Sequence, residues 1–230
     1  MQTELFSEIF PIFESVDDET LGWFLSVADE DDYAADRSVI VDETWGNAVY
    51  FILSGWVKVR YLRDRDPHEP VIIDILGQGG FFGETAILGE SPRNMDVVTC
   101  TSVRLLSVPA QRFIQALFKD IQLQHRMLQL TVKRLQQNNQ RLQLLQEPPN
   151  VRVANILINL AENYGTSTDA GLEIFNLPIE DIADLANVEE EEASKAIERL
   201  KDKGWLQIDP KAQILNLPNP KQIAQLALGR

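Results

Sequence analysis

The sequence has few of the residues that build covalent or metal-bound sites. Its 230 residues include one cysteine, Cys100, and two histidines, His68 and His125, far apart in the chain. A single cysteine excludes an internal disulfide and any multi-cysteine metal or iron–sulfur site built from one chain. Cys100 lies in the strand-like run Thr99–Thr101 and is interpreted as a core or strand residue rather than a nucleophile. Because no nucleophile with a base and no spaced carboxylate pair is evident, we expect neither catalysis nor a metal site.

Long hydrophobic runs are also missing. Apolar stretches such as Val71–Ile73 are far shorter than the about 20 residues that a membrane-spanning helix needs. The segment Met1–Glu4 lacks the basic residues and apolar core of a signal peptide. With 44% apolar and 24% charged residues, the composition is typical of a globular protein with a substantial core. We therefore expect a reducing, cytoplasmic setting and no membrane partner.

Basic residues are outnumbered, since 21 Lys and Arg against 35 Asp and Glu give a formal net charge of −14. Residues 1–118 carry 8 basic and 20 acidic side chains, a net of −12. Residues 119–150 carry 5 and 2, a net of +3, and residues 151–230 carry 8 and 13, a net of −5. Net negative charge repels phosphate backbones, so the composition disfavours nucleic-acid partners in general. The positive middle stretch is a distinct element.

Residues 1–109 are predicted to form an N-terminal helical segment followed by a β-roll. Acids at 17–19, followed by Leu21, Phe24 and Leu25, indicate a helix. From Ser38 onward the chain has short apolar runs separated by Gly and Pro, which is typical of an antiparallel barrel or roll. The predicted strands are 39–41, 50–53, 56–59, 71–75 and 103–106.

Residues 110–147 contain neither Gly nor Pro and are predicted to form one long dimerisation helix. Leucines repeat with the spacing of a coiled-coil seam, at Leu128, Leu135, Leu142 and Leu145. The seam position between Leu135 and Leu142 is polar, either Asn138 or Asn139. We interpret it as a buried asparagine that fixes the register of a parallel homodimer. The alternative is a long helix packed on its own domain.

Residues 148–230 are predicted to form a winged helix-turn-helix domain. Val151–Tyr164 is an apolar helix ended by Gly165, and Pro178 opens a second helix that runs through Ala186. A third helix covers residues 189–203. Two apolar strands around 209–211 then read as a β-hairpin, which completes the winged pattern.

In this order, the parts resemble the cyclic-AMP receptor protein/FNR (CRP/FNR) superfamily of bacterial regulators, from Phe10 to Leu217. The residues that carry the resemblance are Tyr50–Val59 (YFILSGWVKV), Gly79–Glu84 (GGFFGE), Pro92-Arg93, and the stretch from Ile182 to Leu206, which fits the family's helix-turn-helix without a gap. Residues 218–230 look like an addition. The resemblance implies an α+β fold, with a cyclic-nucleotide-binding-type β-roll, a long dimerisation helix and a C-terminal winged helix-turn-helix.

The resemblance also implies a phosphate-binding cassette that begins at Gly83-Glu84 and ends at Arg93. A short helix near Glu84 points backbone N–H groups at an anion, and Arg93 grips a cyclic phosphate with its planar fork. Glu84 accepts a hydrogen bond from a ribose hydroxyl. In the alternative interpretation, Arg93 pairs with Glu84 or Glu90, as a remnant of an ancestral site. The implied ligand-binding residues are Gly83, Glu84, Thr85, Arg93, Asn94, Asn138 and Asn139.

Some of these residues depart from the family pattern. Asn94 replaces a small hydroxyl residue, and Asn138-Asn139 replaces the Thr-Ser pair that cyclic-AMP-binding members offer to adenine. Asparagine both donates and accepts, so base recognition persists with a different pattern. A basic cluster on one predicted strand and its turn, Lys58, Arg60, Arg63 and Arg65, is either solvated surface or a set of contacts for extra phosphates. The expected ligand is therefore a cyclic mono- or dinucleotide.

The predicted recognition helix has the wrong charge for DNA. DNA-binding family members place Arg-Glu near its start, with a further Arg four residues after that Glu; here the start reads Glu189–Glu192, followed by Lys195. In this alignment Glu191 takes the position of the family glutamate, and Glu190 takes the position of the first arginine. Residues 178–201 carry 8 acids and 3 bases, a net of −5. Because phosphate contacts supply much of DNA affinity, DNA binding is doubtful.

Two functions follow. In the first, the chain is a dimeric sensor of a nucleotide second messenger that regulates transcription through contacts with another regulatory protein. In the second, it is a conventional ligand-responsive DNA-binding transcription factor, with phosphate contacts from Arg152, Lys201, Lys203 and Lys211.

Overall fold

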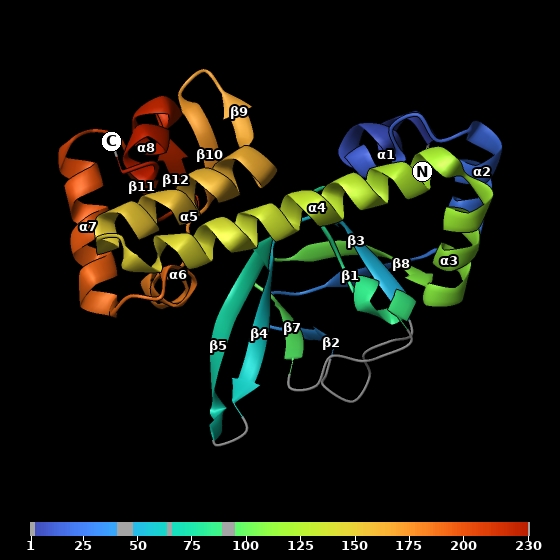
Figure 1. The fold of residues 1–230 in the computed structure, drawn as a ribbon, viewed down its shortest axis with the longest axis horizontal. Coiled ribbons are helices and arrows are strands. Elements are labelled where there is room, and N and C mark those ends of the chain that lie inside the picture. The colour runs from blue at the N-terminus through green and yellow to red at the C-terminus, as the bar shows by residue number, and fades with distance from the viewer. Residues whose placement is uncertain (1–2, 41–47, 64–65, 89–94, 230) are drawn as a thin grey trace. The chain divides into compact units, whose positions relative to one another are not determined.

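The computed structural model describes residues 3–40, 48–63, 66–88 and 95–229. The chain divides into two compact units, Met1–Leu135 and Gln136–Arg230, and each is described by itself. Within the described residues, no helix combines the length and apolar character needed to cross a membrane. The mixed α and β architecture follows the prediction (Figure 1).

The first unit is the predicted β-roll with helices before and after it. Its helical elements are α1 (Thr3–Ile9), η1 (Pro11–Phe13), α2 (Asp18–Ser26), η3 (Glu84–Leu88), α3 (Ala110–Lys119) and the greater part of α4 (Ile121–Gln143). Its strands are β1 (Asp29–Tyr33), β2 (Ser38–Ile40), β3 (Ala48–Ser54), β4 (Val57–Arg63), β5 (Asp66–Leu76), β6 (Phe81–Phe82), β7 (Met95–Thr99) and β8 (Val103–Pro109). They form two four-stranded antiparallel sheets, β1-β8-β3-β6 and β2-β7-β4-β5.

Aromatic side chains hold the helices on the first of these sheets. Six buried phenylalanines from α1, η1, the residue between them, α2, β3 and α3 form the cluster Phe6, Phe10, Phe13, Phe24, Phe51 and Phe113. Phe51 is fully buried and its ring lies 5.5 Å from Phe10 and 5.8 Å from Phe113. Each such burial contributes roughly 1.5–3 kcal/mol. The helices are therefore part of the core of the roll.

The stretch predicted as one helix from Ala110 to Glu147 is interrupted, which corrects that prediction. It consists of α3, then α4, then the short 3-10 helix η4 (Leu144–Gln146). The break is at Asp120, whose backbone is extended and whose carboxylate accepts from the amides of Gln122 (2.7 Å) and Leu123 (3.0 Å). The second carboxylate oxygen accepts from the amide of Asp17 at 3.1 Å. A buried capping carboxylate thus ends one helix and starts the next without Gly or Pro.

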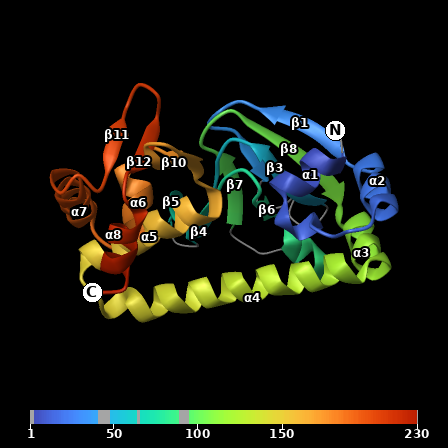
Figure 2. The ribbon, with the colours of Figure 1, turned by 90° about the horizontal axis from the view of Figure 1, so that it is seen from above.

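The second unit contains the predicted winged helix-turn-helix. After the last part of α4 and η4 come α5 (Pro149–Tyr164), α6 (Ile179–Ala186), α7 (Glu190–Asp202) and α8 (Pro220–Ala227). The strands β9 (Thr166–Thr168), β10 (Gly171–Phe175), β11 (Gln207–Asp209) and β12 (Ile214–Leu217) form one sheet in the order β11-β12-β10-β9. Figure 2 shows β10, β11 and β12 of this sheet. The predicted hairpin is confirmed as β11 and β12, whereas the hairpin of β9 and β10 was not predicted.

Candidate functional site

The predicted ligand cassette starts at a tight turn. Gly83 has φ +84°, a left-handed conformation that favours glycine, and a Cβ placed there would come within 2.6 Å of the carbonyl oxygen of Ala48. The turn leads directly into η3, so the expected short helix at Glu84 is present as a 3-10 helix. The first turn of η3 therefore starts where the sequence placed an anion-binding helix.

Thr85 in η3 has an unsatisfied polar atom. Its hydroxyl oxygen Oγ1 is buried and has no hydrogen-bond partner in the part of the chain that the structure describes. A buried hydroxyl without a partner loses its hydration without compensation, which costs about 1–3 kcal/mol. A phosphate or hydroxyl group of a bound ligand would supply the missing bond. The residues present therefore fit an anionic ligand at Gly83–Thr85.

Arg134 on α4 is a contact that the sequence analysis missed. Its Nη1 donates to Oε1 of Glu84 at 3.0 Å, and its Nη2 donates to the carbonyl oxygen of Phe81 at 2.8 Å. Its guanidinium carbon also lies 4.2 Å from the centre of the Phe81 ring. The only sequence signal was its place in the positively charged stretch 119–150. Glu84 keeps further acceptor capacity, because a carboxylate has about four lone-pair sites.

The other predicted ligand residues are not gathered at this cassette by anything that the structure describes. Arg93 and Asn94 lie outside the described residues. Asn138 and Asn139 are exposed on α4 and belong to the second compact unit. Their contact with a ligand stays a prediction.

The predicted basic cluster is partly neutralised. Arg60 on β4 forms two hydrogen bonds to the carboxylate of Asp96 on β7, one of them between Nε and Oδ1 at 2.8 Å. Asp96 is buried. Lys58 lies on the same strand, Arg63 ends it, and Arg65 is outside the described residues. Binding of extra phosphates here stays a prediction, and Arg60 would enter it already paired.

An apolar stripe runs along α4. Leu128, Leu135 and Leu142 repeat every seven residues and have exposed fractions of 62%, 58% and 65%. Val132, 44% exposed, lies between the first two of these leucines. Asn139 follows Val132 by seven residues, so in the predicted seam the polar position would be that of Asn139, with Asn138 beside it. Leu145 falls in η4, beyond the end of the helix.

The helix-turn-helix is built as its sequence predicts. α6 ends at Asn187, which adopts the left-handed conformation (φ 51°, ψ 52°), and its amide bonds back to Ala183 and Asp184. Glu189 is then the N-cap of α7, and its amide donates to Oε2 of Glu192 at 3.2 Å. Glu192 therefore has a structural role, as expected for an acid in the first turn of a helix.

The two lysines of α7 are paired with acids on the same helix. Lys195 Nζ lies 2.6 Å from Glu191 Oε1, and Lys201 Nζ lies 2.9 Å from Glu198 Oε1. The hydrogen bond from Lys195 lowers the pKa of Glu191. Glu189, Glu190, Glu191 and Glu192 are all exposed. The surface that would enter a DNA groove thus presents an acidic first turn followed by neutralised lysines.

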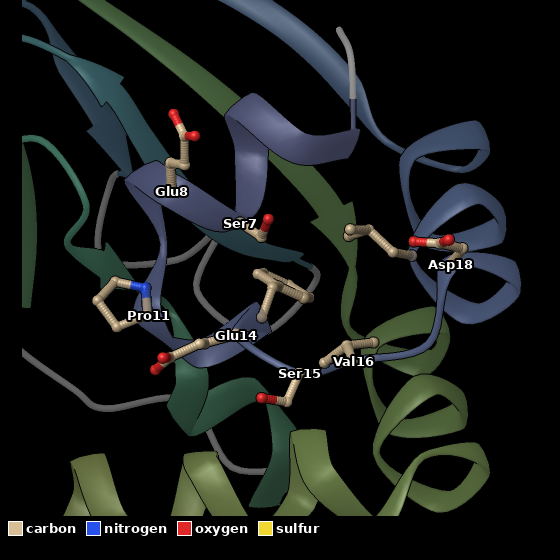
Figure 3. A pocket seen from close by; sticks show the side chains of 9 residues that line it. Ser7, Glu8, Pro11, Glu14, Ser15, Val16 and Asp18 are labelled. Carbon is tan, nitrogen blue, oxygen red and sulfur yellow. The ribbon is translucent and has the colours of Figure 1, made fainter.

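A separate hollow of about 470 Å³ lies among α1, η1 and α2 in the first unit (Figure 3). Its lining includes Glu8, Glu14 and Asp18, whose carboxylates point in different directions. Glu14 also pairs with Arg126 at 3.0 Å. None of the predicted ligand residues lines this hollow.

Comparison with known proteins identifies both halves of the chain. Residues 30–120 match the cyclic nucleotide-binding domain, and residues 151–226 match the Crp-like helix-turn-helix domain. The chain belongs to the CRP/FNR superfamily. Its winged-helix match includes most of residues 218–230, so the interpretation of that segment as an addition is wrong. α8 is part of the family domain.

Relatives of this CRP/FNR protein include the CRP-like cAMP-activated global transcriptional regulator of Mycobacterium tuberculosis, 26% identical over 89% of this chain and 92% of that protein. FixK2 from Bradyrhizobium japonicum has a similar fold (TM-score 0.71, 21% identity, 87% of this chain and 97% of that chain). So has a putative cyclic nucleotide binding protein from Ruegeria pomeroyi (TM-score 0.69, 20% identity, 99% of both chains).

Proposed function

We propose that this regulator is a cytoplasmic homodimer that senses a nucleotide second messenger. Support comes from the left-handed turn at Gly83, the 3-10 helix that follows it and the unsatisfied hydroxyl of Thr85. The similarity to a regulator described as cAMP-activated points to the same ligand class. In a phosphate site of this kind, backbone amides and Thr85 donate to the ligand while Glu84, already oriented by Arg134, accepts from a sugar hydroxyl.

Isothermal titration with cyclic AMP, cyclic GMP and cyclic di-GMP tests the ligand. Thr85→Val is the informative variant, because it removes the unsatisfied hydroxyl and keeps the shape of the side chain. It should leave the free protein as stable as before, or more stable. The affinity for the nucleotide should fall roughly fivefold, because a hydrogen bond that contributes about 1 kcal/mol is lost. Thr131→Val, on α4, is the control. Absence of binding to all three nucleotides would contradict the proposal.

We further propose that the winged-helix domain acts through contacts with another regulatory protein and binds DNA weakly. The observation that carries this is the exposed, acidic first turn of α7, in which one glutamate caps the helix and another holds Lys195. A groove-facing helix of this charge lacks the phosphate contacts that position a protein on DNA.

Gel-shift and genome-wide pulldown at low salt test this second proposal. We expect weak binding without sequence preference, and tight sequence-specific binding would overturn the proposal. The variant Glu189→Ser, Glu190→Arg, Glu192→Thr restores the family-like pattern around Glu191. It should gain DNA affinity with an increased salt dependence if the scaffold is otherwise competent.

The second candidate is a conventional ligand-responsive DNA-binding regulator, which the CRP-like relatives favour. Of its four predicted phosphate contacts, three already have local partners. Arg152 donates to the carbonyl of Asn187, Lys201 pairs with Glu198, and Lys203 lies 4.4 Å from the centre of the Trp205 ring. Lys211, in the loop of the β11–β12 hairpin, is exposed. A specific gel shift abolished by Lys211→Ala would favour this function.

A further inference from the structure

Two arginines hold the end of the first helix of the helix-turn-helix. Nη2 of Arg141 donates to the carbonyl oxygen of Leu185 at 3.0 Å, and Nη1 of Arg152 donates to the carbonyl oxygen of Asn187 at 2.7 Å. Both acceptors lie at the C-terminal end of α6, where carbonyls lack partners within the helix and the helix dipole is negative. A guanidinium there satisfies a carbonyl and is favoured electrostatically.

The two arginines come from different sides of a junction. Arg141 is in the last turn of α4, and Arg152 is in the first turns of α5. Between them lie the 3-10 helix η4 and the pair Pro148-Pro149. A short 3-10 segment next to prolines interrupts the α-helical hydrogen bonds and often marks a hinge. The bond from Arg141 therefore crosses this junction, whereas the bond from Arg152 does not.

We propose that Arg141 is a latch that fixes the winged-helix domain to the last turn of α4. While the hydrogen bond from Arg141 to Leu185 is formed (latch closed), the turn at Asn187 and the start of α7 follow any movement of the end of α4. When this hydrogen bond is broken (latch open), the backbone at 144–149 bends as a hinge, and the recognition helix α7 changes its direction with respect to α4. Arg152 holds the same turn from within the domain and keeps its shape in both states. The latch is thus a conformational device that does not depend on which ligand or partner the chain binds.

Pulsed electron spin resonance on the full-length chain tests the latch. In a Cys100→Ser background, nitroxide labels are attached at Gln136→Cys on α4 and Glu180→Cys on α6, both exposed. Labelled chains are diluted in unlabelled chains so that distances within one chain are measured. We expect one narrow distance distribution without further substitution. Arg141→Met, which keeps the aliphatic stem and removes the donors, should broaden or shift it.

Three variants separate a latch from a general loss of structure. Arg141→Lys keeps the charge and a donor on a stem of similar length and should restore the narrow distribution. Arg152→Met should leave the label distance unchanged while increasing hydrogen exchange around Asn187. Arg141→Gln, too short to reach Leu185, is a second removal variant and should behave like Arg141→Met. Narrow, unshifted distributions in Arg141→Met and Arg141→Gln, with unchanged circular dichroism, would overturn the proposal.

Discussion

Gly83 shows how one residue positions the candidate ligand cassette. Its left-handed φ and the 2.6 Å approach to the carbonyl of Ala48 both exclude a side chain. We expect Gly83→Ala to lower the free energy of unfolding by about 1–3 kcal/mol, through backbone strain and a forced shift of β3. Chemical denaturation followed by circular dichroism measures the change.

Gly22 is the matched control for that substitution. It lies inside α2, and a Cβ there would meet nothing within 4 Å. Gly22→Ala should therefore stabilise the protein by about 0.5–1 kcal/mol, because alanine is the better helix former. Equal effects of the two substitutions would show that the turn at Gly83 tolerates a side chain.

Asp17 makes the stability sensitive to acid. Hydrogen bonding with Thr20, and then with Asp120, lowers its pKa from 3.8 to about 2. A carboxyl group with a depressed pKa in the folded state stabilises the protein above its unfolded pKa. Its contribution is complete above about pH 4 and disappears as the pH falls through 2. We expect the melting temperature to decrease over this interval, and to decrease less in Asp17→Asn.

Asp18→Asn is the control for that experiment, since it removes the same charge from the next residue of α2. It should keep the acid sensitivity of the unsubstituted protein between pH 4 and 2. If Asp17→Asn and the unsubstituted protein lose melting temperature in parallel, the hydrogen bonds of Asp17 do not explain the acid sensitivity.

Which residues could be predicted from the sequence depended on whether their role is local. The cassette that begins at Gly83-Glu84 and the first-turn acids of α7 are marked by residues a few positions apart, so the sequence indicates them. Arg134 donates a hydrogen bond to Glu84, which is 50 positions away in the sequence. Asp120 accepts one from the amide of Asp17, which is 103 positions away. Nothing in the local sequence around Arg134 or Asp120 specifies such a partner.

Elements of regular structure show the same division. Strands with apolar runs were predicted with small shifts of their bounds, for example β3 and β8. β1 consists of Asp29–Tyr33, with four consecutive acids, and no pattern of alternating apolar residues marks it as a strand. It exists because its backbone pairs with β8, in a register that sets Asp29 opposite Ser107 and Tyr33 opposite Val103. In addition, Arg104 forms ion pairs with Glu30 and Asp32. That pairing is tertiary and cannot be found from the segment alone.

The apolar stripe of α4 carries the element-scale prediction. Leu128→Lys together with Leu135→Lys places two ammonium groups in the proposed dimer seam, where burial of an unpaired charge is costly. We expect native mass spectrometry to show monomer in place of dimer. Gln129→Lys with Gln136→Lys adds the same charge at the neighbouring exposed positions and should leave the dimer intact. A dimer that survives the leucine substitutions would contradict the proposed seam.

The whole chain consists of two compact units with separate cores, and this predicts its unfolding. Differential scanning calorimetry should show two transitions, because each unit has its own buried apolar residues. Gly83→Ala should lower the midpoint temperature of the transition that belongs to the first unit. Leu157→Ala, at a fully buried position in α5, should lower the other, with a cost of about 2–5 kcal/mol. A single transition shifted by both variants would show that the units unfold together.

Charge also acts at the scale of the molecule. The total of −14 was predicted to disfavour nucleic acid, but most of the excess belongs to residues 1–118, with a net of −12, and a smaller part to residues 151–230, with a net of −5. The decisive acids are those at the start of α7, where the structure pairs Lys195 and Lys201 within the helix. The local arrangement, rather than the total, is the argument against strong DNA binding.

The carboxylate of Asp120 links the beginning of the chain to the beginning of α4. Because Asp17 is 103 residues earlier, it has already left the ribosome when Asp120 is synthesised. The amide of Asp17 can therefore donate to Asp120 as soon as α4 emerges, during translation. The bonds from the amides of Gln122 and Leu123 to the same carboxylate are local and need no earlier segment.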